Sequence, residues 1–159
     1  MAAANPRRFV LDASVAPKWV LPEPQAADAA RLRFAWQRGT VSLLVPELWV
    51  VEVGNALWAR TRRDLPLRLT RRAAARALGE LEAAGLARHP HGTLTSVAFT
   101  LACDGGITVY DATYLALAIR ENAPLITADH RLVSNTRTLG LADHVLPLRD
   151  IAATLPPDT

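Results

Sequence analysis

Short apolar runs alternate with amphipathic stretches along the whole chain. The runs have the length and composition of buried strands, and they fall at residues 8–11, 41–45, 86–89, 124–127 and 144–146. Between them, apolar positions at helical spacing predict helices at residues 14–20, 25–38, 46–63, 70–84, 93–103, 111–121 and 129–139. Strands that alternate with helices in this way predict an α/β fold, in which helices cover a central parallel sheet of about five strands.

Glycine, proline and threonine mark several of the expected helix boundaries. Gly39 and Gly85 each follow a predicted helix, as glycine commonly does. Thr70 is a good N-cap for the helix that follows it. Pro46 is expected in the first turn of the long helix over 46–63, because that position favours proline.

The length of the chain indicates one domain. The chain has 159 residues, so we expect a single domain over 1–159 with its core at about 8–148. A loop is expected at 64–69 and a frayed end at 156–159. No apolar run approaches the roughly 20 residues of a membrane helix, and no signal-peptide pattern is present, so a cytoplasmic protein without membrane contact is expected. Cys103 is the only cysteine, which excludes an internal disulfide, and its apolar helix predicts a packing role.

Positive charge is carried almost entirely by arginine. The chain has 18 basic and 15 acidic residues, a formal net charge of +3, and Lys18 as its single lysine. A modest positive charge allows a polyanionic partner without proving one. For the clustered arginines, a solvated surface and RNA contact both remain open; these are Arg60, Arg62, Arg63, Arg71, Arg72 and Arg76.

Four acidic residues stand at positions where the expected fold brings segments together. Asp12 directly follows one predicted strand and Asp129 falls just after another, and ligands of such sheets bind at the carboxyl ends of strands. Asp111 begins an almost wholly apolar helix, and Glu52 interrupts the most apolar run of the chain. The alternative for the aspartates is helix capping or dipole stabilisation. For Glu52 the alternative is a buried ion pair with an arginine such as Arg60.

A single site shared by all four acids is the competing hypothesis. Crowded carboxylates repel one another and resist ionisation. A hard divalent cation such as Mg²⁺ or Mn²⁺ reverses that penalty, since it prefers carboxylate oxygens and retained water. Such an ion lowers the pKa of a bound water and stabilises charge on a phosphate during in-line displacement. The acids taken together therefore indicate phosphoryl chemistry.

Several tryptophans and two alanine-rich helices are candidates for contact with a partner molecule. Trp36, Trp49 and Trp58 occupy helical positions and are expected in the core or in a dimer contact, with base stacking as the alternative. The apolar, alanine-rich helices at 47–60 and 73–87 are a candidate partner interface.

Four motifs in a fixed order resemble those of a known family. They are Leu11-Asp12-Ala13-Ser14-Val15, then Pro46-Glu47-Leu48-Trp49 with Glu52-Val53-Gly54-Asn55-Ala56-Leu57, then Tyr110-Asp111-Ala112 with Tyr114-Leu115-Ala116-Leu117-Ala118, then Leu125-Ile126-Thr127-Ala128-Asp129 with Leu132. Each motif alone is weak. Their order, spacing and total length, over about residues 8–148, resemble the PIN-domain family, and specifically the VapC-type toxins of type II toxin–antitoxin pairs.

The resemblance implies a PIN-like three-layer fold and a Mg²⁺- or Mn²⁺-dependent endoribonuclease. The family's catalytic acids correspond to Asp12, Glu52, Asp111 and Asp129. Among these, the implied metal ligands are Asp12, Asp111 and Asp129. The supporting polar positions correspond to Ser14, Asn55 and Thr127. The implied partners are an RNA substrate, a cognate antitoxin protein that blocks the groove, and a second copy of the chain in a homodimer.

Three other functions are weighed against this one. A non-catalytic PIN-like module would bind only RNA or a protein, and the presence of all four acids argues against it. A DNA-directed nuclease of the same fold differs only in substrate. A phosphorelay receiver domain shares the alternating fold and the acidic pocket but needs a lysine late in the chain, and Lys18 is the only lysine.

Overall fold

A sheet of five parallel strands forms the centre of the computed structural model, which describes residues 6–62 and 68–155. The strands are β1 (Arg7–Leu11), β2 (Val41–Pro46), β3 (Ala87–His89), β4 (Leu125–Thr127) and β5 (Val145–Pro147). Their order across the sheet is β3-β2-β1-β4-β5. The predicted parallel α/β sheet is therefore confirmed.

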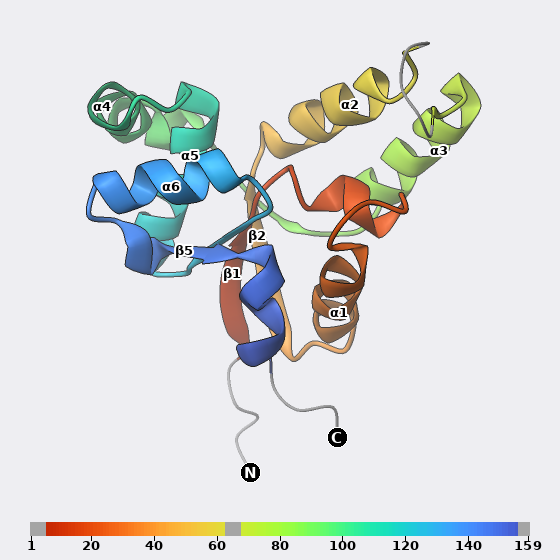
Figure 1. The fold of residues 1–159 in the computed structure, drawn as a ribbon, viewed down its shortest axis with the longest axis horizontal. Helices are drawn as coiled ribbons and strands as arrows, with labels where there is room; N and C mark the ends of the chain where they lie inside the picture. The colour runs from red at the N-terminus through yellow and green to blue at the C-terminus, as the bar shows by residue number, and fades with distance from the viewer. Residues whose placement is uncertain (1–5, 63–67, 156–159) are drawn as a thin grey trace.

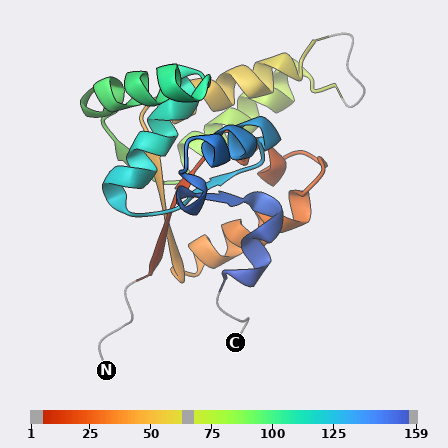
Figure 2. The same ribbon diagram turned by 60° about the vertical axis from the view of Figure 1, so that its left-hand side comes forward.

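Helices cover both faces of this sheet. The α-helices are α1 (Ala26–Gln37), α2 (Trp49–Ala59), α3 (Arg71–Glu82), α4 (Thr95–Gly105), α5 (Val109–Glu121) and α6 (His130–Thr138). The 3-10 helices are η1 (Ala16–Trp19), η2 (Gly92–Leu94), η3 (Ala142–His144) and η4 (Leu148–Ala153). Helix α5 packs on β1 and β2 with α4 against it, while α1 contacts β2, η1 and η4. Figures 1 and 2 show α4, α5 and α6 together on one side and α1 on the other, which gives three layers.

The core is built from β1 and α5. Phe9, Val10 and Leu11 of β1 have no exposed surface, as expected for a parallel strand covered on both faces. Every residue of α5 over 112–118 is buried, because a helix that is apolar nearly all round must lie inside the protein. Any polar group on this stretch of α5 is thereby held at a fixed place against the sheet.

The strand order reverses beside β1. Strands β2 and β3 lie on one side of it, and β4 and β5 on the other. At such a reversal the connections after neighbouring strands diverge and leave a crevice outside the carboxyl ends of the strands. The N–H of Asp12, the first residue after β1, donates to the carbonyl of Ile126 in β4 at 3.0 Å. Asp12 and the end of β4 therefore meet at this crevice.

Pro46 does not begin a helix, which corrects the sequence prediction. It is the last residue of β2 and lies opposite His89 of β3. The N–H of Glu47 donates to the His89 carbonyl at 3.0 Å, so pairing with β3 keeps the chain extended past the proline. The helix expected over 46–63 consequently begins at Trp49. Residues 63–67, with Arg63 and most of the expected loop, lie outside the described residues, as does the end at 156–159.

Two side chains expected to be packed are exposed. Trp58 is 59% exposed whereas Trp49 is 1% exposed, because nine residues at about 100° each place them on opposite faces of α2. Trp58 is therefore not a core residue. Cys103 is also exposed, since the buried face of α4 is formed by Ala98 and Ala102.

Candidate active site

Asp12 is the only buried acidic residue of the described chain, with 5% of its surface exposed. Its Oδ2 accepts hydrogen bonds from Ser14 Oγ at 2.5 Å and from Thr127 Oγ1 at 2.6 Å. Ser14 Oγ in turn accepts from the N–H of Ala128, and Thr127 Oγ1 from the N–H of Asp129, both at 3.0 Å. This network joins the turn after β1 to the turn after β4. Because no described backbone N–H donates to the carboxylate, Asp12 does not serve as a helix cap.

Asp129 is the N-cap of α6, as the capping alternative predicted. Its Oδ1 accepts from the N–H of Arg131 at 2.7 Å and of Leu132 at 3.3 Å. Both bonds fall on Oδ1, so the other carboxylate oxygen stays available to a ligand at the same edge of the sheet. Capping and ligand binding are therefore compatible at Asp129.

Asp111 lies in the first turn of α5. The helix begins at Val109, two residues before the expected start, because Thr108 caps it: Thr108 Oγ1 accepts from the N–H of Asp111 at 3.1 Å. The same hydroxyl donates to Asp111 Oδ2 at 2.7 Å. Thr108 was not singled out from the sequence, although a threonine three residues before an acid at a helix start resembles a capping box.

Glu52 is partnered by a tyrosine rather than an arginine. The Tyr114 hydroxyl donates to Glu52 Oε2 at 2.5 Å, and Tyr114 itself has no exposed surface. Arg60, the candidate partner from the sequence, pairs instead with Glu23. Tyr114 is three residues after Asp111, so both lie on one face of α5. A signal for Tyr114 was present, because a tyrosine in a core helix needs a partner for its hydroxyl.

The four acids influence one another electrostatically. Burial raises the pKa of Asp12, hydrogen bonds from Ser14 and Thr127 lower it, and the charges of Asp111 and Asp129 raise it further. Burial likewise raises the pKa of Glu52 to about 7, against the hydrogen bond from Tyr114, with added repulsion from Asp12 and Asp111.

No internal cation relieves this repulsion. Within the described residues, none of the four acids forms an ion pair with lysine, arginine or histidine. A cation from outside the chain would therefore relieve it.

The side chains are near one another without forming a closed cage. Over 6–62 and 68–155, no three histidine, cysteine, aspartate or glutamate side chains approach closely enough to enclose one metal ion. The structure brings Ser14 and Thr127 onto Asp12. Asn55, one turn after Glu52, is exposed, and no hydrogen bond joins the two in the described residues.

Comparison with known proteins identifies the family of this chain. The PIN domain family matches residues 9–137, a range that contains all four acids. The chain belongs to the PIN domain family. Ribonuclease VapC3 from Pyrobaculum aerophilum is 35% identical to this PIN domain over 127 residues, which cover 79% of the chain and 92% of that protein. Exonuclease VapC9 from the same organism is 27% identical over 112 residues, or 64% of the chain and 73% of that protein. The resemblance to VapC-type members is therefore confirmed.

Solved structures confirm the fold of this PIN domain. PAE2754 from Pyrobaculum aerophilum superposes with a TM-score of 0.66 at 23% identity, covering 93% of the chain and 88% of that structure. FitAcB from Neisseria gonorrhoeae superposes with a TM-score of 0.55 at 17% identity, covering 89% and 98%. At these identities the likeness concerns the fold alone, and the PIN-like three-layer prediction is confirmed.

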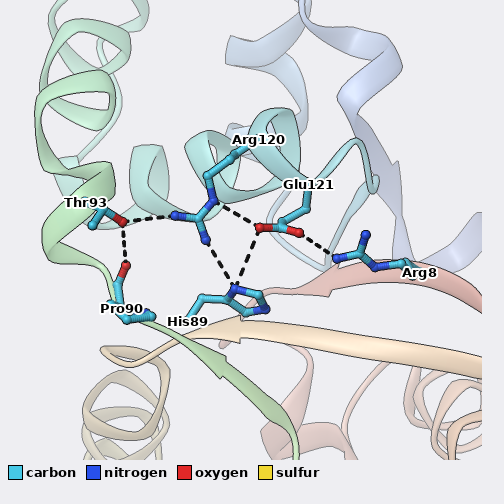
Figure 3. A network of polar contacts seen from close by, with 6 residues as sticks. All are labelled: Arg8, His89, Pro90, Thr93, Arg120 and Glu121. Atoms are coloured by element: carbon cyan, nitrogen blue, oxygen red, sulfur yellow. Dashed lines mark hydrogen bonds and ion pairs between the residues drawn. The ribbon is translucent and has the colours of Figure 1, made fainter.

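An acid of this PIN domain outside that group of four has the opposite electrostatic environment. Glu121, the last residue of α5, accepts from Arg8 Nη2 at 2.6 Å and from Arg120 Nε at 3.0 Å, and its Oε1 lies 3.7 Å from Nδ1 of His89 (Figure 3). The hydrogen bond from Arg8, above all, lowers the pKa of Glu121. This acid is neutralised within the chain, and the network ties β1, β3 and α5 together.

Proposed function

We propose that this PIN domain is a VapC-type ribonuclease that hydrolyses phosphodiester bonds within an RNA strand, with a divalent cation at the acidic site. The family and the two relatives named as nucleases support the reaction class. The observation that carries the proposal is Asp12, a buried carboxylate at the sheet's crevice whose neighbouring charges are acidic and which pairs with no cation of the described residues. The names of those relatives do not decide between cleavage inside the strand and cleavage from its ends, since one of them is named as an exonuclease.

The residues present fit a divalent cation. VapC-type PIN nucleases generally depend on one, and Mg²⁺ is usually held by one or two carboxylates with several retained waters, so three converging acids are not required. Asp12 and Asp111 would hold Mg²⁺ or Mn²⁺ directly, and Asp129 would complete the pocket through its uncapped oxygen. When bound, the ion lowers the pKa of a water and stabilises charge on the phosphate.

The chain's own groups prepare the attack. Hydrogen bonds from Ser14 and Thr127 fix the Asp12 carboxylate in place. Glu52, with a pKa of about 7, titrates at neutral pH, which suits a group that orients the attacking water and receives its proton. In-line attack by water leaves 5′-phosphate and 3′-hydroxyl ends. Arginines around the pocket hold neighbouring phosphates, and unpaired bases give the strand access.

Protein partners are the second part of the proposal. Val51 and Trp58 on one face of α2 are 73% and 59% exposed, and Trp58 lines a hollow of about 320 Å³ between α2 and α3. Apolar surface of this kind is typical of protein interfaces. It supports binding of a cognate antitoxin and formation of a homodimer. None of the described helices is long and apolar enough to cross a membrane, and the cytoplasmic location stays a prediction.

The reaction is tested by offering the purified chain single-stranded RNA and DNA of one sequence, with Mg²⁺, with Mn²⁺ or with EDTA. Internal RNA cleavage with 5′-phosphate ends, dependent on the metal, is expected. RNA binding that is equal with and without metal and never leads to cleavage would favour the binding module. Cleavage of DNA alone would favour the DNA nuclease, and trimming from strand ends an exonuclease.

The partner is tested in cells. Expression of the chain alone should arrest growth, and co-expression of a small DNA-binding protein encoded by the adjacent upstream reading frame should relieve the arrest. Growth arrest that this neighbour does not relieve would contradict the antitoxin pairing while leaving the nuclease intact.

A further inference from the structure

The positive charge of this protein is concentrated in one segment. Residues 60–76 contain seven arginines and one aspartate, a net charge of +6, while the whole chain carries +3, so the remainder is −3. The acidic crevice belongs to that negative remainder. A polyanionic substrate therefore gains from cationic contacts outside the crevice as well, and this segment is where positive charge is densest in the chain.

A hollow of about 340 Å³ lies beside this segment, between the end of η1 and helix α3. Val20, just after η1, and Arg72 and Arg76 of α3 are among its lining residues. The two arginines are four residues apart and so project from one face of the helix. Glu80 is the single acid among the lining residues. Two arginine side chains thus line one open space.

Neither arginine has a carboxylate partner among residues 6–62 and 68–155. Within the described residues neither Arg72 nor Arg76 forms an ion pair, whereas Arg8, Arg31 and Arg60 each bind an aspartate or glutamate. A guanidinium group presents its donors as a planar fork that matches two oxygens of one phosphate. The unpaired arginines are therefore free to bind an external oxyanion.

The start of α3 reinforces the positive potential there. Thr70 lines the hollow and caps the helix by accepting from the N–H of Ala73. The first turn of α3 carries no acidic residue, so the positive end of the helix dipole is not offset locally. A second hollow has a volume of about 230 Å³. Leu21, Arg60 and Arg68 are among its lining residues.

We propose that the hollow between η1 and α3 is a phosphate subsite, in which Arg72 and Arg76 bind backbone phosphates of the RNA strand away from the bond that is cut. This inference rests on the proposed ribonuclease function and extends it to a longer substrate. Val20 follows Asp12 by eight residues, which limits their separation to roughly 28 Å even for an extended chain. A strand several nucleotides long joins the two places.

The test measures RNA binding as a function of salt. An Asp12→Asn background prevents cleavage, and a fluorescent single-stranded oligoribonucleotide serves as the probe. Each phosphate contact on a single strand contributes about 0.7 to the slope of log K against log salt, so Arg72→Gln with Arg76→Gln should lower the slope by about 1.4.

Arg71→Gln is the matched control. It removes one positive charge from the adjacent residue of the same helix, but Arg71 lines the other hollow, between α2 and α3. Glutamine and arginine have similar helix propensities, and circular dichroism melting verifies folding of every variant. Arg71→Gln should leave the slope unchanged, while Arg72→Gln alone should lower it by about 0.7.

The remaining outcomes separate this inference from the proposed function. An unchanged slope in the double variant, with a wild-type chain that cleaves RNA, overturns the subsite and leaves the nuclease standing. If the double variant loses binding of polyglutamate but not of RNA, the hollow serves an acidic protein segment and the proposal is wrong. A wild-type chain that neither binds nor cuts RNA refutes the ribonuclease itself.

Discussion

Helix α5 carries an acid near each end, and the two ends have opposite environments. Near its start, Asp111 faces a group of acids that includes Asp12 and Glu52. At its last residue, Glu121 is held by Arg8 and Arg120 (Figure 3). The pKa values of Asp12 and Glu52 are raised, chiefly by burial, and that of Glu121 is lowered, chiefly by Arg8.

The contrast distinguishes an acid that stabilises the fold from acids that await a ligand. Glu121 obtains its counter-charges from the chain, so its ionisation favours the folded state. Asp12 and Glu52 have hydroxyl partners but no cation among the described residues, and their pKa values are raised, so their ionisation opposes folding until a cation arrives. This comparison leads to four predictions.

The largest effect is expected from Asp12→Asn. Changes to groups that merely support metal ligands cost about 10–100-fold, so loss of the central ligand should lower the RNA cleavage rate by more than about 100-fold. Stability without metal should be unchanged or higher, because a buried charge and its repulsions are removed while the carbonyl oxygen still accepts from Ser14 and Thr127. Cleavage assays and thermal melting measure the two effects. A destabilised variant that cleaves RNA normally would show that Asp12 stabilises the fold and does not hold the metal ion for catalysis.

Tyr114→Phe should have the next largest effect. Loss of the hydroxyl removes the hydrogen bond that lowers the pKa of Glu52, so the acidic limb of the pH–rate profile should move to higher pH. The rate at pH 7 should fall by roughly 10-fold, as for other supporting groups. Tyr110→Phe is the control, since Tyr110 is 62% exposed and its change should leave the profile in place. An unshifted profile for Tyr114→Phe would remove Glu52 from the proton transfer.

Metal binding should depend on pH, because the ionised ligands Asp12 and Asp111 repel the charge of nearby Glu52 and a bound cation relieves that repulsion. The folded pKa of Glu52, about 7, exceeds its ordinary value of 4.5, so the metal-free protein should lose stability as pH rises from about 4.5 to 7. A cation that binds the folded state stabilises it by about 2.7 kcal/mol at 100 times its dissociation constant. Calorimetry should therefore show a larger Mg²⁺-induced rise in Tm at pH 8 than at pH 5. Equal Tm shifts at both pH values would contradict a metal site whose carboxylates must be ionised.

Glu121→Gln should give the smallest effect and one of opposite sign. The lowered pKa of Glu121 means that its contribution is present above about pH 4.5 and is lost as pH falls further. Exposed networks of this kind are worth about 0.5–1 kcal/mol, so denaturant titration at pH 7 should show a loss of that size, and the loss should shrink at pH 3. RNA cleavage should be unaffected. A loss of cleavage would show that Glu121 contributes to activity, and would contradict the separation of roles between the two ends of α5.

Predictions that depended on local patterns were largely met. The alternation of apolar runs predicted the five parallel strands, and the apolar run of α5 predicted a core helix. The position of Asp12 and Asp129 just after strands predicted that both lie at one edge of the sheet, and Thr127, two residues before Asp129, does share a hydrogen bond with Asp12 there. These features follow from periodicity and from the geometry of parallel sheets, which a sequence expresses directly.

Errors arose where tertiary pairing overrode a local preference. Pro46 satisfies the rule for a helix start, yet pairing with His89 keeps it in β2. The alternative for Glu52, an ion pair with an arginine such as Arg60, is wrong as well, because Glu23 pairs with Arg60 and Tyr114 binds Glu52.

The sequence by itself determined most of the elements, the burial of β1 and α5, and the position of three acids at element boundaries and of Glu52 within an apolar helix, because each of these depends on residues within a few positions of one another. Only the tertiary structure decided the distant partners of Asp12, Glu52 and Glu121. The hydroxyl of Thr127 beside Asp12, the hydroxyl of Tyr114 beside Glu52 and the guanidinium of Arg8 beside Glu121 each come from a segment far away in the chain. These contacts depend on the packing of β1, β4, α2 and α5 together, and that packing brings no cation of the described residues to the acids of the crevice.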